Sequence, residues 1–376
     1  VYRGRRMAHP ESPDDDTQLG YVAVVYGGGA LPTQEVVAGD LNRRETEASF
    51  ASAVLAADLN RDGYADVLVS DPLSQTADPE RLRGKVWVLW GSASGISAER
   101  RRLLVNGPDG TGRALAYAPT PSPVLAVGGR ERPGGSLRLY PVHHDGTMGN
   151  RRLISLATPG VPGPPREGSE FGSPLAASGS LLVVGAPHAT VGDVRKAGAA
   201  YVLRMRQGLA FGITRLSQAG GGVPEAPEAG DEFGAAVSVH QRYVAVGVPG
   251  EGFGVAARVG LVQAFAMSPP GRRLTAQHVR SATQSSLLVP GFASGAGHWW
   301  GSSVAVYRPC TGAFGVLAVG RSGVASAARV PLTPAGTCPA AVVATGAFTN
   351  HHIGILRTSV GGTTAEPTEF TVAEGF

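Results

Sequence analysis

The stretch "EFGSPLAASGSLLVVGAP", residues 170–187, consists of two short apolar segments enclosed between Phe-Gly and Gly-Ala-Pro. A similar stretch, "EFGAAVSVHQRYVAVGVP", occupies residues 232–249, so each landmark recurs 62 residues further along the chain. Self-similarity at a fixed spacing is the sequence signature of repeat architectures. The two stretches therefore predict a fold built from repeated units.

Weaker copies begin elsewhere, and within each unit short apolar segments are bounded by Gly and Pro, as expected of strands joined by turns. The chain contains 54 Gly and 28 Pro among 376 residues, which suits an all-β protein with many turns. Four-stranded sheets repeated at this spacing are typical of propeller blades. We predict one β-propeller domain over residues 1–376, with six or seven four-stranded blades. The repeats start near Phe50, Gly112, Phe171, Phe233 and Trp300.

The two ends of the chain are expected to close the ring. "GYVAVVYGGG" at Gly20 matches "GKVWVLWGSA" at Gly84, so residues 1–49 are expected to hold the second half of a unit whose first half is missing. The C-terminal region, residues 340–376, would complete this blade with strands near 353–358 and 370–372.

The Phe-Gly opening and the Gly-Ala-Pro closing resemble the FG-GAP repeats of the integrin α-subunit β-propeller. Residues 247–249 and 70–72 are variants of the closing, and Trp300-Gly301 is a variant of the opening. "PEAGDEFGAAVS" at Pro224 is similar to repeats in exported integrin-like proteins of actinobacteria. The resemblance covers residues 20–323 and implies an integrin-type propeller, but not a biochemical role.

An acidic stretch, "DLNRDGYAD", occupies residues 58–66. Oxygen ligands at loop positions 1, 3, 5, 7 and 9 are typical of a calcium loop, and they would come from the side chains of Asp58, Asn60, Asp62 and Asp66 and the carbonyl of Tyr64. The loop resembles the short calcium loops of FG-GAP repeats and predicts one structural Ca²⁺ site. An Asx-rich turn without metal is the alternative.

Repeat spacing supports the calcium interpretation. From the repeat start to the GAP-like motif there are 14 residues in the units at Phe171 and Phe233 but 20 in the unit at Phe50. The extra residues fall where the acidic stretch lies. The unit at Trp300 has a similar insertion, "RPCTGAF", without an acidic residue.

The two cysteines, Cys310 and Cys338, could form a disulfide in an exported protein or remain as two thiols in a cytosolic one. We expect the disulfide, because both fall in the repeat that starts at Trp300. The chain opens at Val1 without an initiating Met, as a processed chain would, and we expect a secreted or cell-surface location. No stretch of 18 apolar residues is present, so we expect no membrane insertion.

The formal net charge is +4, and all but two of the 33 basic residues are Arg, a bias typical of a GC-rich genome. Aromatic residues make up 6% of the chain, too few for basic patches interleaved with stacking rings, so we expect no nucleic-acid partner. Arg doublets at 101–102, 151–152 and 272–273 are expected on outer strands, where charge blocks pairing with other chains. An acidic polymer partner is their alternative explanation.

Catalysis finds little support, because the chain has no Gly-x-Ser-x-Gly, no His-Glu-x-x-His and no P-loop motif. We expect a non-catalytic extracellular interaction or adhesion module that binds a protein or a glycan through loops on one propeller face. The alternatives are a propeller-type polysaccharide lyase or glycosidase, and a structural subunit of a larger surface assembly. An axis lined by several carboxylates or Arg would favour the enzyme, and one lined by small apolar groups would favour the binding module.

Overall fold

The structure is a computed structural model that describes residues 2–7, 18–24, 34–37, 49–75, 82–220, 222–253, 258–282, 299–310, 313–319, 327–331, 359–360 and 363–364. These residues form β-strands, their connections and one 3₁₀ turn, η1 (Ala98–Arg100). Within these ranges no helix has the length and apolar character needed to cross a membrane. The all-β prediction is confirmed.

Four antiparallel sheets of four strands follow one another along the chain, each with its strands in sequence order. We call these sheets blades and number the strands of each from one to four. The first blade comprises β4 (Val54–Ala57), β5 (Asp66–Gln75), β6 (Leu82–Leu89) and β7 (Arg101–Pro108). The second comprises β8 (Leu115–Ala118), β9 (Val124–Gly129), β10 (Ser136–Pro141) and β11 (Arg152–Ile154). The third comprises β12 (Leu175–Ser178), β13 (Leu181–Ala186), β14 (Ala199–Arg206) and β15 (Leu209–Leu216). The fourth comprises β16 (Ala236–His240), β17 (Tyr243–Val248), β18 (Leu261–Met267) and β19 (Ala276–Ala282).

Three smaller sheets lie toward the chain ends. One contains β1 (Tyr2–Met7), β2 (Gln18–Val24) and β3 (Gln34–Val37), another contains β20 (Ser303–Cys310), β21 (Ala313–Val319) and β22 (Ala327–Pro331), and β23 (Ser359–Val360) pairs with β24 (Thr363–Thr364). β1 was not predicted, because no repeat landmark marks it. The strands expected near 353–358 and 370–372 lie outside the described residues.

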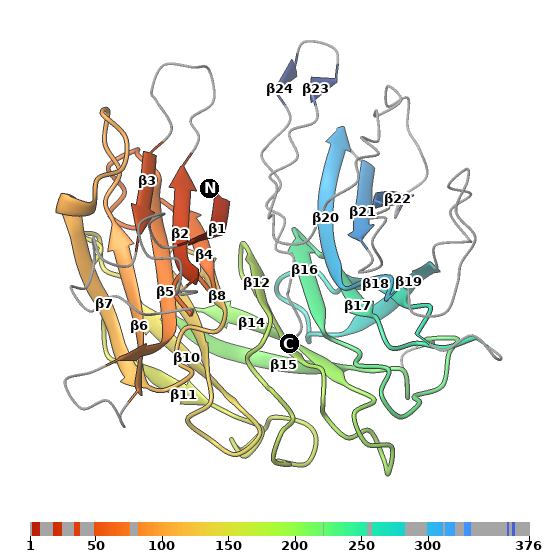
Figure 1. Ribbon diagram of the computed structural model, residues 1–376. Coiled ribbons are helices and arrows are strands. Elements are labelled where there is room, and N and C mark those ends of the chain that lie inside the picture. Colours follow the sequence, from red (N-terminus) through yellow and green to blue (C-terminus); the bar gives the residue numbers. More distant parts are fainter. Residues whose placement is uncertain are drawn as a thin grey trace.

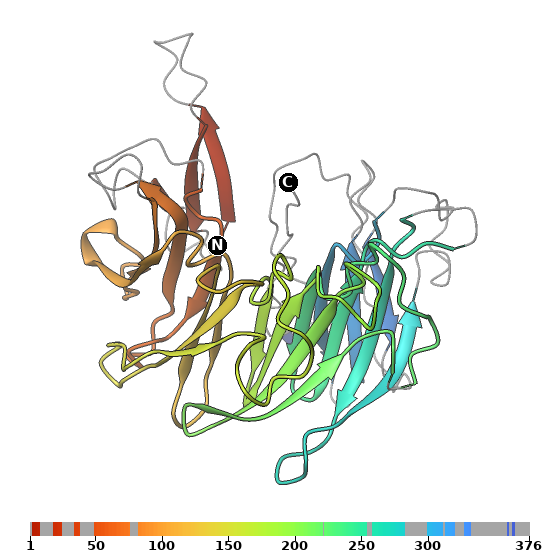
Figure 2. The same cartoon turned by 90° about the horizontal axis from the view of Figure 1, so that it is seen from below.

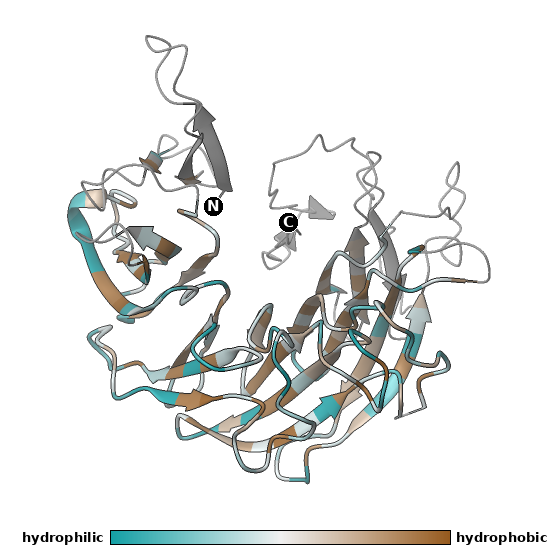
Figure 3. Cartoon of the chain, turned by 60° about the horizontal axis from the view of Figure 1, so that its bottom comes forward, coloured by the Kyte–Doolittle hydropathy of each residue, from teal (hydrophilic) through white to brown (hydrophobic). Residues whose placement is uncertain are grey.

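The blades stand side by side in an arc that runs from the N-terminal to the C-terminal side (Figures 1 and 2). The first strands of neighbouring blades contact one another, β4 with β8, β8 with β12, β12 with β16 and β16 with β20. They therefore line the inner side of the arc, and the fourth strands lie at its outer edge. Hydrophobic residues are concentrated along the strands (Figure 3). This is the arrangement of a β-propeller.

The aromatic residue of each Phe-Gly motif fills the space between two blades. Phe171 is buried and packs edge-to-face on Tyr201, with ring centroids 5.2 Å apart, inside a core that includes residues of the second and third blades. Trp300 is likewise fully buried, between the fourth blade and the β20–β22 sheet. Burial of each such ring contributes about 1.5–3 kcal/mol, so the aromatic residue of the motif stabilises the packing between blades.

The same motif also ties blades together through the backbone. The amide of Phe171 donates to the carbonyl of Gly134 at 2.7 Å, and the amide of Phe233 donates to the carbonyl of Ala197 at 3.0 Å. In each case the acceptor precedes the third strand of the preceding blade. The motif is therefore a joint between consecutive blades.

The connections emerge at two ends of each blade, because successive strands are antiparallel. The 1–2 and 3–4 connections share one end, which we call the hairpin end, and the 2–3 and inter-blade connections share the other, which we call the long-loop end. In the third blade the 1–2 hairpin has two residues, 179–180, whereas in the first blade it has eight, 58–65. The predicted insertion of the acidic stretch is therefore confirmed as a feature of this hairpin.

Candidate functional site

The acidic hairpin between β4 and β5 is folded around its own side chains. Asp58 accepts hydrogen bonds from the amides of Asp62 and Gly63, at 3.2 and 3.0 Å. Asn60 Oδ1 accepts from the Asp62 amide at 3.2 Å, and Asp62 Oδ1 accepts from the Tyr64 amide at 2.9 Å. These bonds hold the oxygen-bearing side chains on the inside of one tight turn, as an Asx-rich loop requires.

Asp66 closes the hairpin from its buried end. Its side chain is fully buried, and its two oxygens accept hydrogen bonds from the amides of Leu59 and Gly91, at 2.8 and 2.9 Å. Burial raises the pKa of Asp66, and the nearby charges of Asp62 and Asp58 raise it further, against the lowering effect of the two amide bonds. Three carboxylates therefore repel one another across this hairpin, and a cation would relieve that repulsion.

The donor chemistry of the hairpin fits calcium, because every candidate ligand is an oxygen. In the described part of the chain, however, no three His, Cys, Asp or Glu side chains are arranged to hold a metal ion. The three carboxylates therefore lie near one another without forming a ready-made cluster, and Tyr64, the predicted carbonyl ligand, is exposed.

A second concentration of charge lies at the long-loop end. His188 follows β13 and lies between two glutamates, with Nδ1 3.6 Å from Glu170 and Nε2 3.7 Å from Glu232. Contact with Glu232 is the main cause of a raised pKa for His188, opposed by burial and assisted by the charge of Glu170. Each glutamate directly precedes a Phe-Gly motif, so His188 bridges the inter-blade joints on either side of the third blade. The sequence did not predict this site, although the Glu-Phe-Gly triplet at both repeats is a pattern that could have indicated it.

Trp299 lies at the same end, with an arginine stacked on its ring. The guanidinium of Arg258 lies 4.4 Å from the centroid of the indole, a distance at which cation–π attraction contributes about 0.5–1 kcal/mol at an exposed site. The Trp299 amide donates to the Arg258 carbonyl at 3.0 Å. One face of the indole is therefore covered by the protein itself.

Two carboxylates are buried beneath the long loops of the third and fourth blades. Asp231 and Glu251 are 2% and 3% exposed, and burial raises their pKa values to about 6 and about 8. Gln218 Nε2 donates to Glu251 at 2.5 Å, and the Glu228 amide donates to Asp231 at 2.5 Å. No sequence motif marked these residues, because their proximity arises only when residues 217–232 cross over to the fourth blade.

A serine and a histidine approach each other on β19. Ser281 Oγ lies 3.2 Å from His278 Nε2, but the same nitrogen lies 2.7 Å from Gln263 Oε1. Because Gln263 Oε1 can only accept a hydrogen bond, His278 Nε2 is the protonated ring nitrogen that donates to it. A protonated Nε2 cannot also act as the base for Ser281. The group is a half-buried polar network and not a nucleophile–base pair.

Other sequence signals resolve as packing or surface features. Arg101 and Arg102 begin β7, an outer strand, and are exposed, as predicted. Arg272 and Arg273 lie instead in the hairpin before β19. Cys310 ends β20, within the first hairpin of its sheet, whereas Cys338 lies outside the described residues, so the disulfide stays a prediction.

Comparison with known proteins gives a family for the repeat. Residues 50–89, which include the acidic hairpin, match the model described as FG-GAP repeat. The chain therefore carries an FG-GAP repeat in its first blade, within a fold of repeated four-stranded blades.

No curated protein matches the chain. Among solved structures, Sqt1 of Chaetomium thermophilum, bound to the N-terminus of ribosomal protein L10, is similar with 14% identity and a TM-score of 0.43, over 84% of this chain and 66% of that one. This chain thus spans slightly under two thirds of the Sqt1 chain. The periplasmic gluconolactonase PpgL of Pseudomonas aeruginosa is similar with 15% identity and a TM-score of 0.39, over 85% of this chain and 76% of that one.

Proposed function

We propose that this propeller is a non-catalytic interaction module outside the cytoplasm, of adhesive type, which binds a protein or a glycan through its long-loop end. The observation that carries the proposal is the composition of the inner strands. β4, β8, β12 and β16 read VLAA, LAYA, LAAS and AVSVH, without an Asp, Glu, Lys or Arg. On the fifth inner strand, β20, the one such residue is Arg308, which lies near the end of the strand and is exposed. Of the groups that acid–base chemistry at the axis could use, β4, β8, β12 and β16 supply only Tyr117 and His240, and the His240 ring packs against Phe314 with ring centroids 5.9 Å apart.

The long-loop end offers the surface that binding requires. In the third blade the 2–3 connection spans 187–198 and the connection to the fourth blade spans 217–235, whereas both hairpins at the opposite end have two residues, 179–180 and 207–208. Loops on a rigid scaffold commonly carry recognition. His188 with its two glutamates and the Arg258–Trp299 pair give this end both charge and an aromatic surface.

We further propose that the acidic hairpin holds one structural Ca²⁺. The ligands would be the side chains of Asp58, Asn60, Asp62 and Asp66 and the carbonyl of Tyr64. The ion would neutralise the repulsion that contributes to the raised pKa of Asp66. All its ligands come from one hairpin, which leaves few coordination positions for a substrate, so its role would be to stabilise the blade.

The extracellular location is part of the same proposal. It is supported by the resemblance to exported integrin-like proteins and by the expected pairing of Cys310 with Cys338. The test is to screen the purified chain on glycan and protein arrays and, in parallel, against panels of polysaccharides and esters. Saturable binding without turnover is expected. Turnover of any substrate in the panels would contradict the proposal.

A further inference from the structure

The outer strand of the third blade, β15, is an open sheet edge. It pairs with β14 over residues 209–210 and 212–216, on either side of a bulge at Phe211, and no other strand among the described residues pairs with its far side. Natural proteins usually protect such edges with charge, because the unpaired amides and carbonyls can accept a further strand. β15 instead exposes Leu209 and Phe211, which are 37% and 70% exposed. Phe211 is the most exposed large hydrophobic residue in the described part of the chain.

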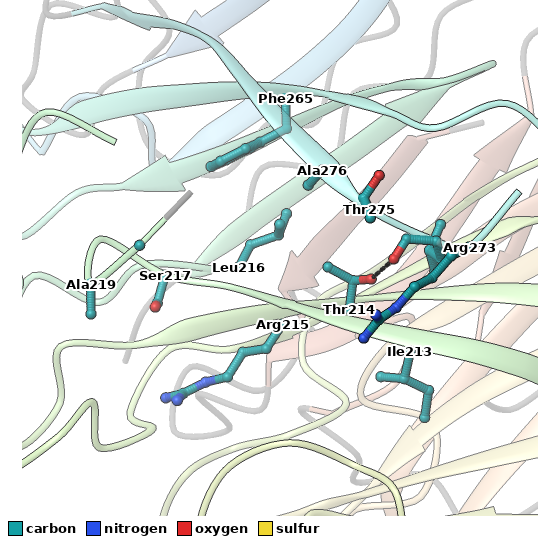
Figure 4. A pocket seen from close by; sticks show the side chains of 12 residues that line it. Ile213, Thr214, Arg215, Leu216, Ser217, Ala219, Phe265, Arg273, Thr275 and Ala276 are labelled. Carbon is teal, nitrogen blue, oxygen red and sulfur yellow. Dashed lines mark hydrogen bonds between the residues drawn. The ribbon is translucent and has the colours of Figure 1, made fainter. Parts of the chain in front are cut away.

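A groove of about 450 Å³ runs beside this edge, between β15 and the third and fourth strands of the next blade (Figure 4). This volume lies within the range of about 300–1,000 Å³ that is usual for binding pockets. Apolar groups from both blades form much of its wall, namely Ile213, Leu216, Ala219, Phe265, Leu274 and Ala276. The edge and the groove together form a continuous surface, which we call the β15 surface.

The groove is held open by hydrogen bonds between the two blades. Thr214 Oγ1 donates to the Leu274 carbonyl at 2.7 Å, which is drawn in Figure 4. The buried guanidinium of Arg204 donates to the carbonyls of Ser268, Pro269 and Arg272, at 2.5, 3.1 and 2.9 Å. The hairpin that precedes β19 is therefore fixed against the third blade, and an incoming ligand would not have to order it.

The charge around the β15 surface has one sign. The guanidinium of Arg206 lies 5.4 Å from the centroid of the Phe211 ring. The Arg273 side chain extends past Thr214 toward Ile213 (Figure 4), and no described carboxylate pairs with it. Neither Asp nor Glu lines the groove. Arg215 differs, because its head group is directed away and donates to the Thr190 carbonyl at 2.9 Å.

We propose that the β15 surface binds an extended acidic peptide segment of a partner protein, which adds as a further strand to the edge of β15. Main-chain hydrogen bonds to the edge would supply affinity, and alternate side chains would supply specificity. Apolar side chains would enter the groove, and carboxylates would pair with Arg206 and Arg273. A second copy of this chain would bring a like-charged edge, so its charge does not complement the surface.

The test is fluorescence anisotropy with a labelled synthetic peptide that alternates glutamate and valine, compared with a peptide of the same length that alternates lysine and valine. The acidic peptide should bind, and its affinity should fall as salt is raised. Phe211→Ser and Arg273→Glu should each weaken binding by about tenfold or more. The matched controls are Phe253→Ser, on an exposed loop residue, and Arg102→Glu, on the outer strand of the first blade, and both should leave binding unchanged.

Three results would overturn the proposal. The first is that the wild-type protein does not bind the acidic peptide. The second is that it binds the lysine peptide equally well, which would remove the role of charge. The third is that Arg102→Glu weakens binding as much as Arg273→Glu, which would make the attraction a property of net charge and not of the β15 surface. Self-association abolished by Phe211→Ser, with no peptide binding, would assign the edge to a second copy instead.

Discussion

A Cβ atom placed on Gly185 would lie 2.2 Å from the carbonyl oxygen of Gly234. Gly185 belongs to the Gly-Ala-Pro motif of the third blade, and Gly234 to the Phe-Gly motif of the fourth. In the same way, a Cβ atom placed on Gly128 would lie 2.0 Å from the carbonyl oxygen of Gly172. The Gly-Ala-Pro motif of one blade therefore meets the Phe-Gly motif of the next. The glycine of Gly-Ala-Pro is required because the backbone of the next blade approaches it too closely for a Cβ atom.

This relationship predicts the cost of a single methyl group. Gly185→Ala should lower the free energy of unfolding by about 1–3 kcal/mol, because the added Cβ can be accommodated only if two blades separate. Gly220→Ala is the matched control, since nothing lies within 4 Å of a Cβ at Gly220. Urea denaturation of both variants measures the difference. Equal stability of the two variants would show that the blades are not in contact at this joint.

Stability should depend on pH through the buried carboxylates. Burial raises the pKa of Glu251 to about 8, so the folded state holds a proton that the unfolded state releases near pH 4.5. The contribution of this proton to the free energy of unfolding should therefore be fully present below pH 4.5, and it should be lost as pH rises through about 8. Glu251→Gln should remove this component, so the variant should lose less stability than wild type as pH rises from 4.5 to about 8.

Urea denaturation at a series of pH values measures this effect. Glu167→Gln, on an exposed residue of the connection between the second and third blades, is the control and should keep the wild-type profile. Parallel profiles for wild type and Glu251→Gln would contradict a protonated Glu251 in the folded state.

Calcium should stabilise the protein through the acidic hairpin. At free calcium 100-fold above its dissociation constant, mass action predicts a gain of about 2.7 kcal/mol. Wild type should melt at a higher temperature with calcium than with chelator. The control variant Asp193→Ala, which changes an exposed acidic residue elsewhere, should show the same difference. Asp62→Ala should melt like the chelated wild type in both conditions. If chelator leaves the wild-type melt unchanged and elemental analysis finds no calcium, the hairpin is an Asx-rich turn.

The expected disulfide has its own measurement. A Cys310–Cys338 bond would close a loop that contributes roughly 3 kcal/mol in the chain-entropy model. Alkylation without reduction, followed by mass spectrometry, should recover one cross-linked peptide pair. Two alkylated thiols would exclude the bond and would remove one of the two supports for an extracellular location.

The blades could be predicted from the sequence because their landmarks are local. Phe171 and Phe233 recur at one spacing, and the six extra residues before β5 mark the acidic hairpin without any tertiary information. By contrast, Gly185 lies within the extended strand β13, and its constraint comes from another blade, which no local pattern records.

The remaining features depend on contacts between distant segments. Glu251 and Asp231 become neighbours only because the inter-blade loop packs on the fourth blade, and no short-range pattern records that crossing. The β15 surface likewise combines residues of two blades. The composition of β15, with Phe211 beside Gly212, resembles that of any other strand. Its exposure could be learned only from the position of the strand at the outer edge.

The most direct test of the central claim, that the long-loop end is the recognition surface, compares two matched arginines. Arg258 lies over Trp299 at the long-loop end, and Arg242 lies over Tyr243 at the hairpin end, at 4.4 and 5.4 Å from the ring centroids. The measurement is the dissociation constant, by calorimetry, of the ligand identified on the arrays. Arg258→Ala should weaken binding by about tenfold while Arg242→Ala leaves it unchanged. Loss of binding in Arg242→Ala with full binding in Arg258→Ala would contradict the account.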